Sequence, residues 1–511
     1  MIGASMATQA RSLAQTLGWI AGPVAAAIVY VALPDSFSNA TGATEVFSHA
    51  GRASAALGAW MAIWWLTEAT DLAATALLPL AVLPLVGAST IRDAAAPYAH
   101  ELIFLFMGGF LLSLSMQRWG LHRRIALSTL RIVGTSPARV VAGFMFTTAL
   151  LSMWLSNTAT VVMMLPIALS VIGLVFRPTE GQREALDDPD EPRRFAACLM
   201  LGTAYASSIG GIGTIIGSPP NLFLVSYVRD NLGREISFVR WMLVWTPLVA
   251  IFLPIAWYVL TRHVFPISTE SRHGESAVRR LSDTLPPLNH GERVTLIVFA
   301  LAIAGWVLRP VLIDLTLWGM SPFAGLTDPG IAMTAALCLF VVPSGDPQGG
   351  FVLDWEHTRD LPWGTLILFG GGLSLAAAIE QHGVGSFLGY QVSALAGLPS
   401  WLLVLLVSTL VVFLTELTSN TATAATLVPI LAGVAIGLGV HPFVLIVPTA
   451  IGASWAFMLP AATPPNAIVF GSGHVTMAQM RRAGVWLNVV GIALLSAFSY
   501  GIALPLLGAM P

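Results

Sequence analysis

The chain carries one polar pentapeptide twice, as Ser156–Thr160 and Ser419–Thr423, each reading Ser-Asn-Thr-Ala-Thr. The match extends further at a constant separation of 263 positions, as from Asn157 to Asn420. It also pairs Phe106 with Phe369, Gly108-Gly109 with Gly371-Gly372, Gly120 with Gly383, and Pro166 with Pro429. A long match in one register indicates an internal duplication. The duplication predicts two related halves that each bring one polar motif to a shared site.

The composition indicates the solvent that this chain folds in. Of its 511 residues 56% are hydrophobic and only 10% are charged, whereas about a quarter of a soluble protein is charged. We therefore predict an all-α polytopic membrane protein, since helices satisfy their own backbone groups in lipid. The net charge of −2 gives no reason to expect a nucleic-acid partner. Cys198 and Cys338 lie in apolar runs of different segments, which favours buried, unpaired thiols over a disulfide or a metal site.

Apolar runs at about 17–33, 53–65, 72–86 and 102–116 predict the first four spans. Glu68 and Asp71 fall at the turn between the second and third, where we expect a structural role. Arginines cluster after the fourth span, in the linker between about 262 and 293, and just before the last span. Short arginine-rich loops stay in the cytoplasm. The pattern predicts a multi-pass protein of the inner (plasma) membrane with its N-terminus in the cytoplasm and its C-terminus outside.

The segment Val140–Phe176 is almost wholly apolar and about twice as long as one span. Arginines flank it on the same side, so we predict a re-entrant hairpin with its tip at Ser156–Thr158. The same argument predicts a second hairpin over about Trp401–Gly437. Five spans are expected between the hairpins, at about 195–228, 240–262, 293–313, 330–343 and 362–381. Because five is odd, the second hairpin must enter from the opposite face, which makes the repeat an inverted one.

Each hairpin is followed by a segment that a helix cannot continue through. The first contains a glycine run and then Gly217-Ser218-Pro219-Pro220-Asn221, and the second contains Thr463-Pro464-Pro465-Asn466. Proline lacks the N–H of a helix and clashes with the preceding turn. Broken helices at membrane depth occur where their freed backbone groups line a cavity or bind a ligand. Two matched breaks, one in each half, therefore predict a binding site.

The residue types of these four segments suit an anion together with cations. Neutral side-chain oxygens and unwound carbonyls are ligands for small hard cations such as Na⁺, and helix N-termini favour carboxylate or sulfate. None of the motifs contains Arg or His, so bound cations are the natural counter-charge for an anion. Glu416, beside the second motif, could add charge near a cation or hold the hairpin through hydrogen bonds. Both interpretations are open at this point.

A resemblance to a known family is carried by both Ser-Asn-Thr motifs and by the run from Ser454-Trp455-Ala456-Phe457-Met458-Leu459-Pro460 into Ala461–Val469. The chain resembles the divalent anion/sodium symporter family, whose members carry dicarboxylates, citrate or sulfate. The resemblance covers essentially the whole chain. It implies an elevator-type transporter that forms a homodimer, with about eleven transmembrane helices, two re-entrant hairpins, Na⁺ as coupling ion and no organic cofactor. It also implies scaffold helices in 1–136, a first transport-domain half in 137–262, a linker and further scaffold helices in 263–398, and a second transport-domain half in 399–511.

The family's site residues carry over onto matching positions of this chain. The resemblance places a first sodium ion at Ser152, Ser156, Asn157 and Gly217, and a second at Thr415, Thr418, Asn420 and Ala462. It places the anion at Asn157, Thr158, Asn420, Thr421, Thr463 and Pro464.

We expect a sodium-coupled importer of C4-dicarboxylates such as succinate, malate or fumarate. The first alternative is a dicarboxylate exchanger on the same fold, and another is a sodium/sulfate or sodium/citrate symporter. A different class, an intramembrane enzyme or a channel, is disfavoured. The motifs contain no catalytic dyad or metal cluster, and their polarity is concentrated at two breaks rather than along one pore.

Overall fold

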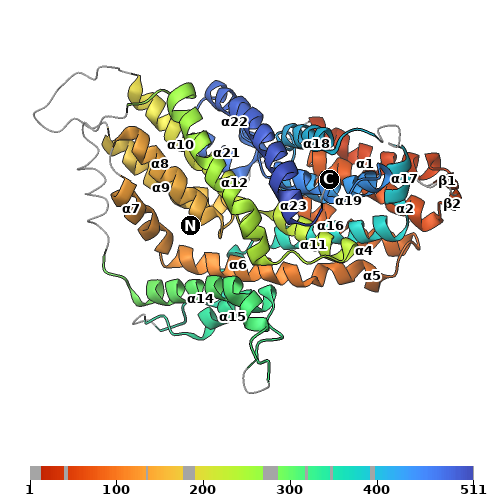
Figure 1. Ribbon diagram of the computed structural model, residues 1–511, viewed down its shortest axis with the longest axis horizontal. Helices are drawn as coiled ribbons and strands as arrows, with labels where there is room; N and C mark the ends of the chain where they lie inside the picture. The colour runs from red at the N-terminus through yellow and green to blue at the C-terminus, as the bar shows by residue number, and fades with distance from the viewer. Residues whose placement is uncertain are drawn as a thin grey trace, which may run out of the picture.

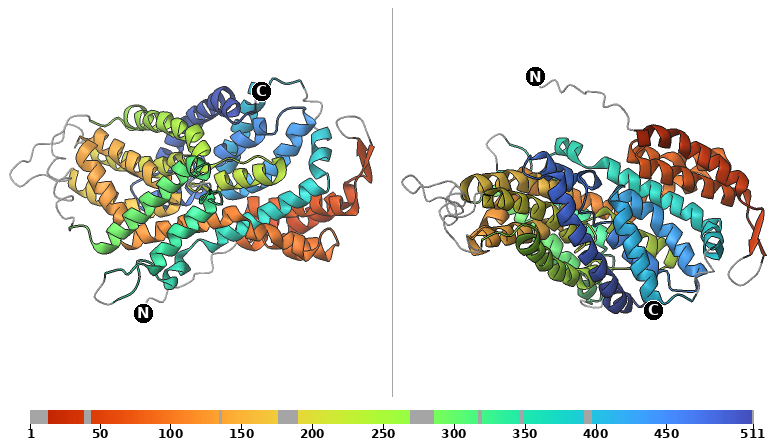
Figure 2. Two further views of the ribbon diagram at one scale, coloured as in Figure 1. Left: turned by 60° about the horizontal axis from the view of Figure 1, so that its bottom comes forward. Right: turned by 90° about the horizontal axis from the view of Figure 1, so that it is seen from above.

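The computed structural model describes residues 13–38, 44–133, 136–175, 190–268, 286–316, 320–345, 349–391 and 397–509. The predicted all-α architecture is confirmed, and the described residues add only a short antiparallel pair of strands at one end of the molecule (Figures 1 and 2). Seven of the described helices are long and apolar enough to cross a membrane, and six apolar helices are shorter. The segments before the first hairpin are α1 (Leu13–Ala32), β1 (Ser36–Ser38), β2 (Thr44–Val46), α2 (His49–Thr67), α3 (Leu72–Thr75), α4 (Leu78–Leu85), α5 (Ile91–Ala95), η1 (Ala96–Ala99), α6 (Glu101–Arg118) and α7 (Leu121–Val133).

Both predicted hairpins are present. The first consists of α8 (Pro137–Ser152) and α9 (Asn157–Val175), and the second of α18 (Ser400–Thr415) and α19 (Asn420–Gly437). In each hairpin the helix stops after a Ser or Thr and restarts at the Asn of the motif, so the motif forms the tip. In Figure 1 the first hairpin lies to the left and α18 and α19 lie to the right. Phe176, the predicted end of the first hairpin, lies outside the described residues.

Both predicted breaks are also present. The first separates α10 (Glu191–Gly211) from α11 (Pro219–Leu232), and the second separates α20 (Phe443–Gly452) from α21 (Pro464–Gly471), with the short 3₁₀ helix η5 (Pro460–Ala462) between them. Each restarted helix begins with its Pro-Pro pair, because proline at the first helical position costs no hydrogen bond.

The remaining helices are α12 (Phe238–Tyr258) continued by the π-helix η2 (Val259–Val264), α14 (His290–Ile313), α15 (Asp328–Val341), η3 (Trp355–Asp360), α16 (Trp363–Gln381), α17 (Val384–Gln391), α22 (Met477–Phe498), the π-helix η6 (Ser499–Ala503) and α23 (Leu504–Leu506).

The two halves meet at matched residues. The rings of Phe106 on α6 and Phe369 on α16 touch edge to face, with centroids 5.4 Å apart. The matched glycines Gly108 and Gly371 lie against the backbones of Ala332 and Ala76, where an added methyl group would clash. Small residues of this kind let membrane helices approach closely. Contact between equivalent residues is expected for halves related by a twofold axis.

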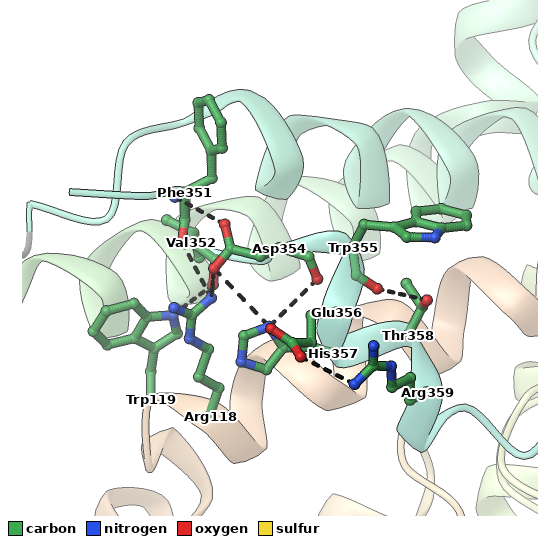
Figure 3. A network of polar contacts seen from close by, with 10 residues as sticks. All are labelled: Arg118, Trp119, Phe351, Val352, Asp354, Trp355, Glu356, His357, Thr358 and Arg359. Atoms are coloured by element: carbon green, nitrogen blue, oxygen red, sulfur yellow. Dashed lines mark hydrogen bonds and ion pairs between the residues drawn. The ribbon is translucent and has the colours of Figure 1, made fainter. Parts of the chain in front are cut away.

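The loop between α15 and α16 is fixed to the end of α6 (Figure 3). Arg118 pairs with Asp354 at 3.0 Å, and the indole N–H of Trp119 donates to the carbonyl of Val352 at 2.9 Å. Burial alone would raise the pKa of Asp354. The Phe351 N–H and the Arg118 guanidinium outweigh that effect and lower the pKa below its usual value. The loop therefore holds the first turn of α16 at the edge of the site described next.

Candidate functional site

Each hairpin tip makes the same pair of hydrogen-bond contacts. The Ser152 hydroxyl lies 2.6 Å from Oδ1 of Asn157 and 2.8 Å from the carbonyl of Ser207. The Thr415 hydroxyl lies 2.8 Å from Oδ1 of Asn420 and 3.0 Å from the carbonyl of Ala453. One hydroxyl proton cannot serve two acceptors fully. Each tip is therefore rich in acceptor oxygens, as a cation site requires.

The asparagines of the two Pro-Pro-Asn motifs hold the breaks open. The Asn221 amide donates to the carbonyls of Gly211 and Thr214, both at 2.9 Å. The Asn466 amide donates to those of Ala456 and Leu459, both at 3.0 Å. Each amide satisfies two carbonyls that the break leaves without helical partners. The sequence indicated the breaks but not this role of their asparagines.

Oxygen atoms crowd together at the first tip. A methyl group on Gly217 would lie 2.5 Å from the carbonyl oxygen of Gly211 and 2.9 Å from that of Ser152. One on Gly211 would lie 2.5 Å from Oδ1 of Asn157. The structure thus brings together Ser152, Asn157 and Gly217 of the predicted first cation set. It adds Gly211, which the sequence analysis did not assign to the site although it noted the glycine run. The hydroxyl of the fourth residue, Ser156, accepts the N–H of Ala159 at 3.2 Å and so faces its own helix.

The second tip is built from a similar set. Thr415 and Asn420 are in contact, and Ala462 lines the same cavity as Asn420. The hydroxyl of Thr418 is engaged inside its own hairpin, 2.6 Å from the hydroxyl of Thr423 and 3.0 Å from the carbonyl of Leu414. The structure therefore joins Thr415 with Asn420, places Ala462 on the cavity that Asn420 lines, and directs the Thr418 side chain elsewhere.

Glu416 follows Thr415 and is only 4% exposed. Its Oε1 accepts the N–H groups of Phe457 and Met458 at 2.7 and 2.9 Å and the Asn488 amide at 2.7 Å. Its Oε2 accepts the N–H groups of Met458 and Leu459 at 3.0 and 3.2 Å. A carboxylate offers about four lone-pair positions, so these five bonds saturate it. Of the two roles considered for Glu416, the geometry favours the holding of the hairpin tip against the unwound stretch.

Both tips and both breaks open into one cavity of about 1000 Å³. Its lining includes all six predicted anion contacts: Asn157, Thr158, Asn420, Thr421, Thr463 and Pro464. Thr463 accepts the N–H of Asn466 at 3.2 Å, and its hydroxyl can still donate a proton to an anion. Among the described residues that line the cavity there is no arginine or histidine. The cavity therefore offers an anion hydroxyl and amide donors but no side-chain cation.

Another part of the cavity lining was not predicted. It is formed by α6 and the start of α16, with Gln117 and Asp360, and by the turn that carries Glu68 and Asp71. That turn is where the sequence placed it, since Glu68 ends α2 and Asp71 caps α3. Charged residues at the ends of spans were the available signal, but their spacing does not reveal which of them face a cavity.

The chain is similar to known proteins along most of its length. The family model described as the sodium:sulfate symporter transmembrane region matches residues 26–507. A Staphylococcus saprophyticus protein named sodium-dependent dicarboxylate transporter SdcS is 38% identical over 500 residues, which is 97% of this chain and 93% of that protein. A Staphylococcus aureus protein of the same name is 39% identical over 458 residues, which is 89% of this chain and 86% of that protein.

Solved structures of other transporters share the fold. The Alcanivorax borkumensis YdaH transporter superposes with a TM-score of 0.58 at 15% identity, over 94% of this chain and 97% of its own. Neisseria gonorrhoeae MtrF, described as one of a class of antimetabolite efflux pumps, superposes with a TM-score of 0.58 at 14% identity, over 96% of this chain and 95% of its own. At this identity the likeness concerns the architecture alone.

Proposed function

Because the chain belongs to the sodium:sulfate symporter family, and is therefore a membrane transporter and not an enzyme, we propose that it imports C4-dicarboxylates such as succinate, malate or fumarate together with sodium ions. The names of the relatives support sodium and dicarboxylates as the transported species. The family resemblance expected from the sequence is confirmed by the family match.

The observation that carries the proposal is the pair of matched oxygen cages on one cavity. The Ser152–Asn157 pair and the Thr415–Asn420 pair each stand at a hairpin tip beside a break. The same cavity is lined by Thr463 and by the N-terminus of α21, which favours a carboxylate. The cages bind sodium, and the sodium ions supply the positive charge that the cavity wall lacks.

The proposed translocation is an elevator motion. The hairpins, the broken helices, α12 and α22, in segments 137–262 and 399–511, form the moving transport domain. The helices of 1–136 and 263–398 form the scaffold and the interface of a homodimer. With the orientation expected from the arginines, the cavity wall that carries Glu68, Asp71 and Asp360 is cytoplasmic, so the cavity faces the cytoplasm.

Uptake of labelled succinate into proteoliposomes, with either sodium or choline outside, tests the proposal. We expect uptake with sodium outside and none with choline. Malate and fumarate should compete with succinate more strongly than citrate or sulfate do. Stronger competition by sulfate or citrate would reassign the substrate within the same fold. Equal uptake in choline would contradict sodium coupling.

A further inference from the structure

The tip of the first hairpin is docked on a helix outside the proposed transport domain. The ring of Trp154 stacks on Phe238, at the start of α12, with centroids 6.0 Å apart, and on Trp306 of α14 at 6.1 Å. Phe299 of α14 meets the Trp154 ring edge-on at 5.6 Å. Phe238 and Trp306 also stack on each other at 4.6 Å, and both are buried. Four aromatic rings thus join the hairpin tip and α12 to α14.

A buried carboxylate adds to this contact. Asp328, the first residue of α15, accepts the N–H of Phe238 at 3.1 Å and pairs with Arg309 of α14 at 3.3 Å. The indole N–H of Trp306 donates to the Asp328 carbonyl at 3.1 Å. A carboxylate at a helix N-terminus is stabilising, so the junction of α14 with α15 holds the start of α12 by charge as well as by stacking.

The side chains at the matched positions of the second half are exposed. Leu417, the counterpart of Trp154 in the duplication, is 74% exposed. Met477 begins α22 as Phe238 begins α12, and it is 49% exposed. The junction that would receive them is that of α2 with α3. There Trp65 donates its indole N–H to the carbonyl of Leu72, the first residue of α3, at 3.1 Å, just as Trp306 does to Asp328.

The second hairpin and that junction both line the cavity, through Asn420 and Thr421 of the tip and Leu72 of α3. The chemistry of the second junction also differs. Leu72 stands there in the place of Asp328, and α22 is capped within its own first turn by Thr476 and Gln479. The first half thus has a stack of aromatic rings at its junction. At the α2–α3 junction, where Glu68 ends α2 and Asp71 caps α3, the matched residues Leu417 and Met477 bring no ring.

We propose that the Trp154–Phe238–Trp306 stack and Asp328 bias the protein toward the state in which the cavity lies open beside Glu68 and Asp71. This inference rests on the proposed elevator motion. In the opposite state, the repeat brings Leu417 and Met477 onto the α2–α3 junction and withdraws Trp154 from α14. That state gains no ring stack, so it is the minor one. Each aromatic pair changes the ratio of the two states by about 2- to 12-fold.

The bias has a consequence for transport. A ligand that binds only the minor state has its apparent affinity reduced by the fraction of protein in that state. The stack therefore weakens the apparent affinity for external substrate and keeps the external side closed when no substrate is bound. Loosening the stack raises apparent affinity from outside without altering any residue of the binding site.

Distance measurements between spin labels read the two states directly. The labels are placed at Leu243 on α12 and Leu301 on α14, which are 68% and 65% exposed, in a full-length background with Cys198→Ser and Cys338→Ser. The protein is reconstituted in lipid nanodiscs. Trp154→Leu, Asp328→Asn and Leu417→Trp are compared with Trp401→Leu, which removes an exposed tryptophan of α18. Trp154→Phe keeps a ring in the stack.

We expect the minor distance to gain about tenfold in population ratio for Trp154→Leu, since that variant loses its ring pairs. Asp328→Asn and Leu417→Trp should shift the ratio in the same direction, whereas Trp401→Leu and Trp154→Phe should resemble the wild type. Unchanged populations in Trp154→Leu and Asp328→Asn would overturn the proposal. A single distance in every variant and with every ligand would overturn the motion beneath it. Sodium-independent uptake by the wild type would instead contradict the proposed function and leave the measured bias standing.

Discussion

In the first half of the molecule the unwound stretch 212–218 accepts hydrogen bonds through its carbonyl groups, whereas in the second half the stretch 453–459 is held through its carbonyl groups and, in addition, through its N–H groups. Trp241 and Thr246 of α12 donate to the carbonyls of Ile212 and Gly213 at 2.9 and 3.3 Å. In the second half the acceptor is Glu416, whose carboxylate takes the N–H groups of Phe457–Leu459. Met153 occupies the matched position of the first half.

This difference separates the roles of the two cages. The backbone geometry is the same, as the matched bonds of Asn221 and Asn466 show. The second cage stands beside a fixed carboxylate, and the first stands among neutral groups. We therefore expect a cation at the second cage to be favoured even in the empty site, and a cation at the first to depend more on the charge of the bound anion. Coupling of this kind is reciprocal and typically amounts to about 1–3 kcal/mol.

The largest expected effect is the same in both halves. Asn157→Ala and Asn420→Ala each remove the side-chain oxygen at a hairpin tip that lines the cavity. Each variant should abolish sodium-dependent succinate uptake while expression and elution volume stay normal. Normal uptake by either variant would remove that asparagine from the site.

Glu416→Gln removes the carboxylate that distinguishes the second half from the first. The amide places an NH₂ group among N–H donors, and removing one partner of a buried charged network costs about 3–5 kcal/mol. We expect a lower melting temperature and a weaker apparent sodium affinity. Met153→Leu, at the matched position, should cost less than about 1.5 kcal/mol because it conserves volume. Wild-type sodium affinity in Glu416→Gln would show that the carboxylate does not support the second cage.

Gly217→Ala and Ala462→Gly test the difference in the other direction. The methyl group added at Gly217 meets carbonyl oxygens of the first cage, and such overpacking costs about 1–3 kcal/mol. If that free energy is lost from sodium binding, the sodium affinity should fall roughly 5- to 150-fold. Ala462→Gly lies at the corresponding place in the second half and should have a much smaller effect. Similar losses in the two variants would mean that the cages are equally tight.

The smallest expected effect concerns the anion. Thr463→Ala removes one hydroxyl donor, a loss of about 1 kcal/mol or roughly fivefold in affinity. Succinate binding, measured by calorimetry in sodium, should weaken more than sodium binding does. Ser218→Ala is the matched control, because Ser218 directly precedes the first restarted helix as Thr463 precedes the second, and its hydroxyl lies 3.0 Å from that of Ser454. A loss confined to sodium binding in Thr463→Ala would reassign Thr463 to a cation.

Much of the fold could be predicted because its signals are local. The duplicated motif, the doubled apolar length of each hairpin and the paired prolines each determine a nearby stretch of backbone. The grouping of Ser152 with Asn157 and of Thr415 with Asn420 came from the family resemblance. The four partners of Glu416, the role of Gly211 and the stack around Trp154 could not be predicted, because each joins segments far apart in the chain. The exposure of Glu68 and Asp71 to the cavity depends likewise on how α2 packs beside α16.

The central claim is that the two cages make sodium obligatory for movement of the anion. Vesicles loaded with unlabelled succinate, and placed in choline or sodium with labelled succinate outside, test it most directly. The account predicts rapid entry of label in sodium and none in choline, because a cavity without side-chain cations cannot hold a dianion when its cages are empty. Equal entry of label in choline would contradict the account and establish an exchanger that needs no sodium.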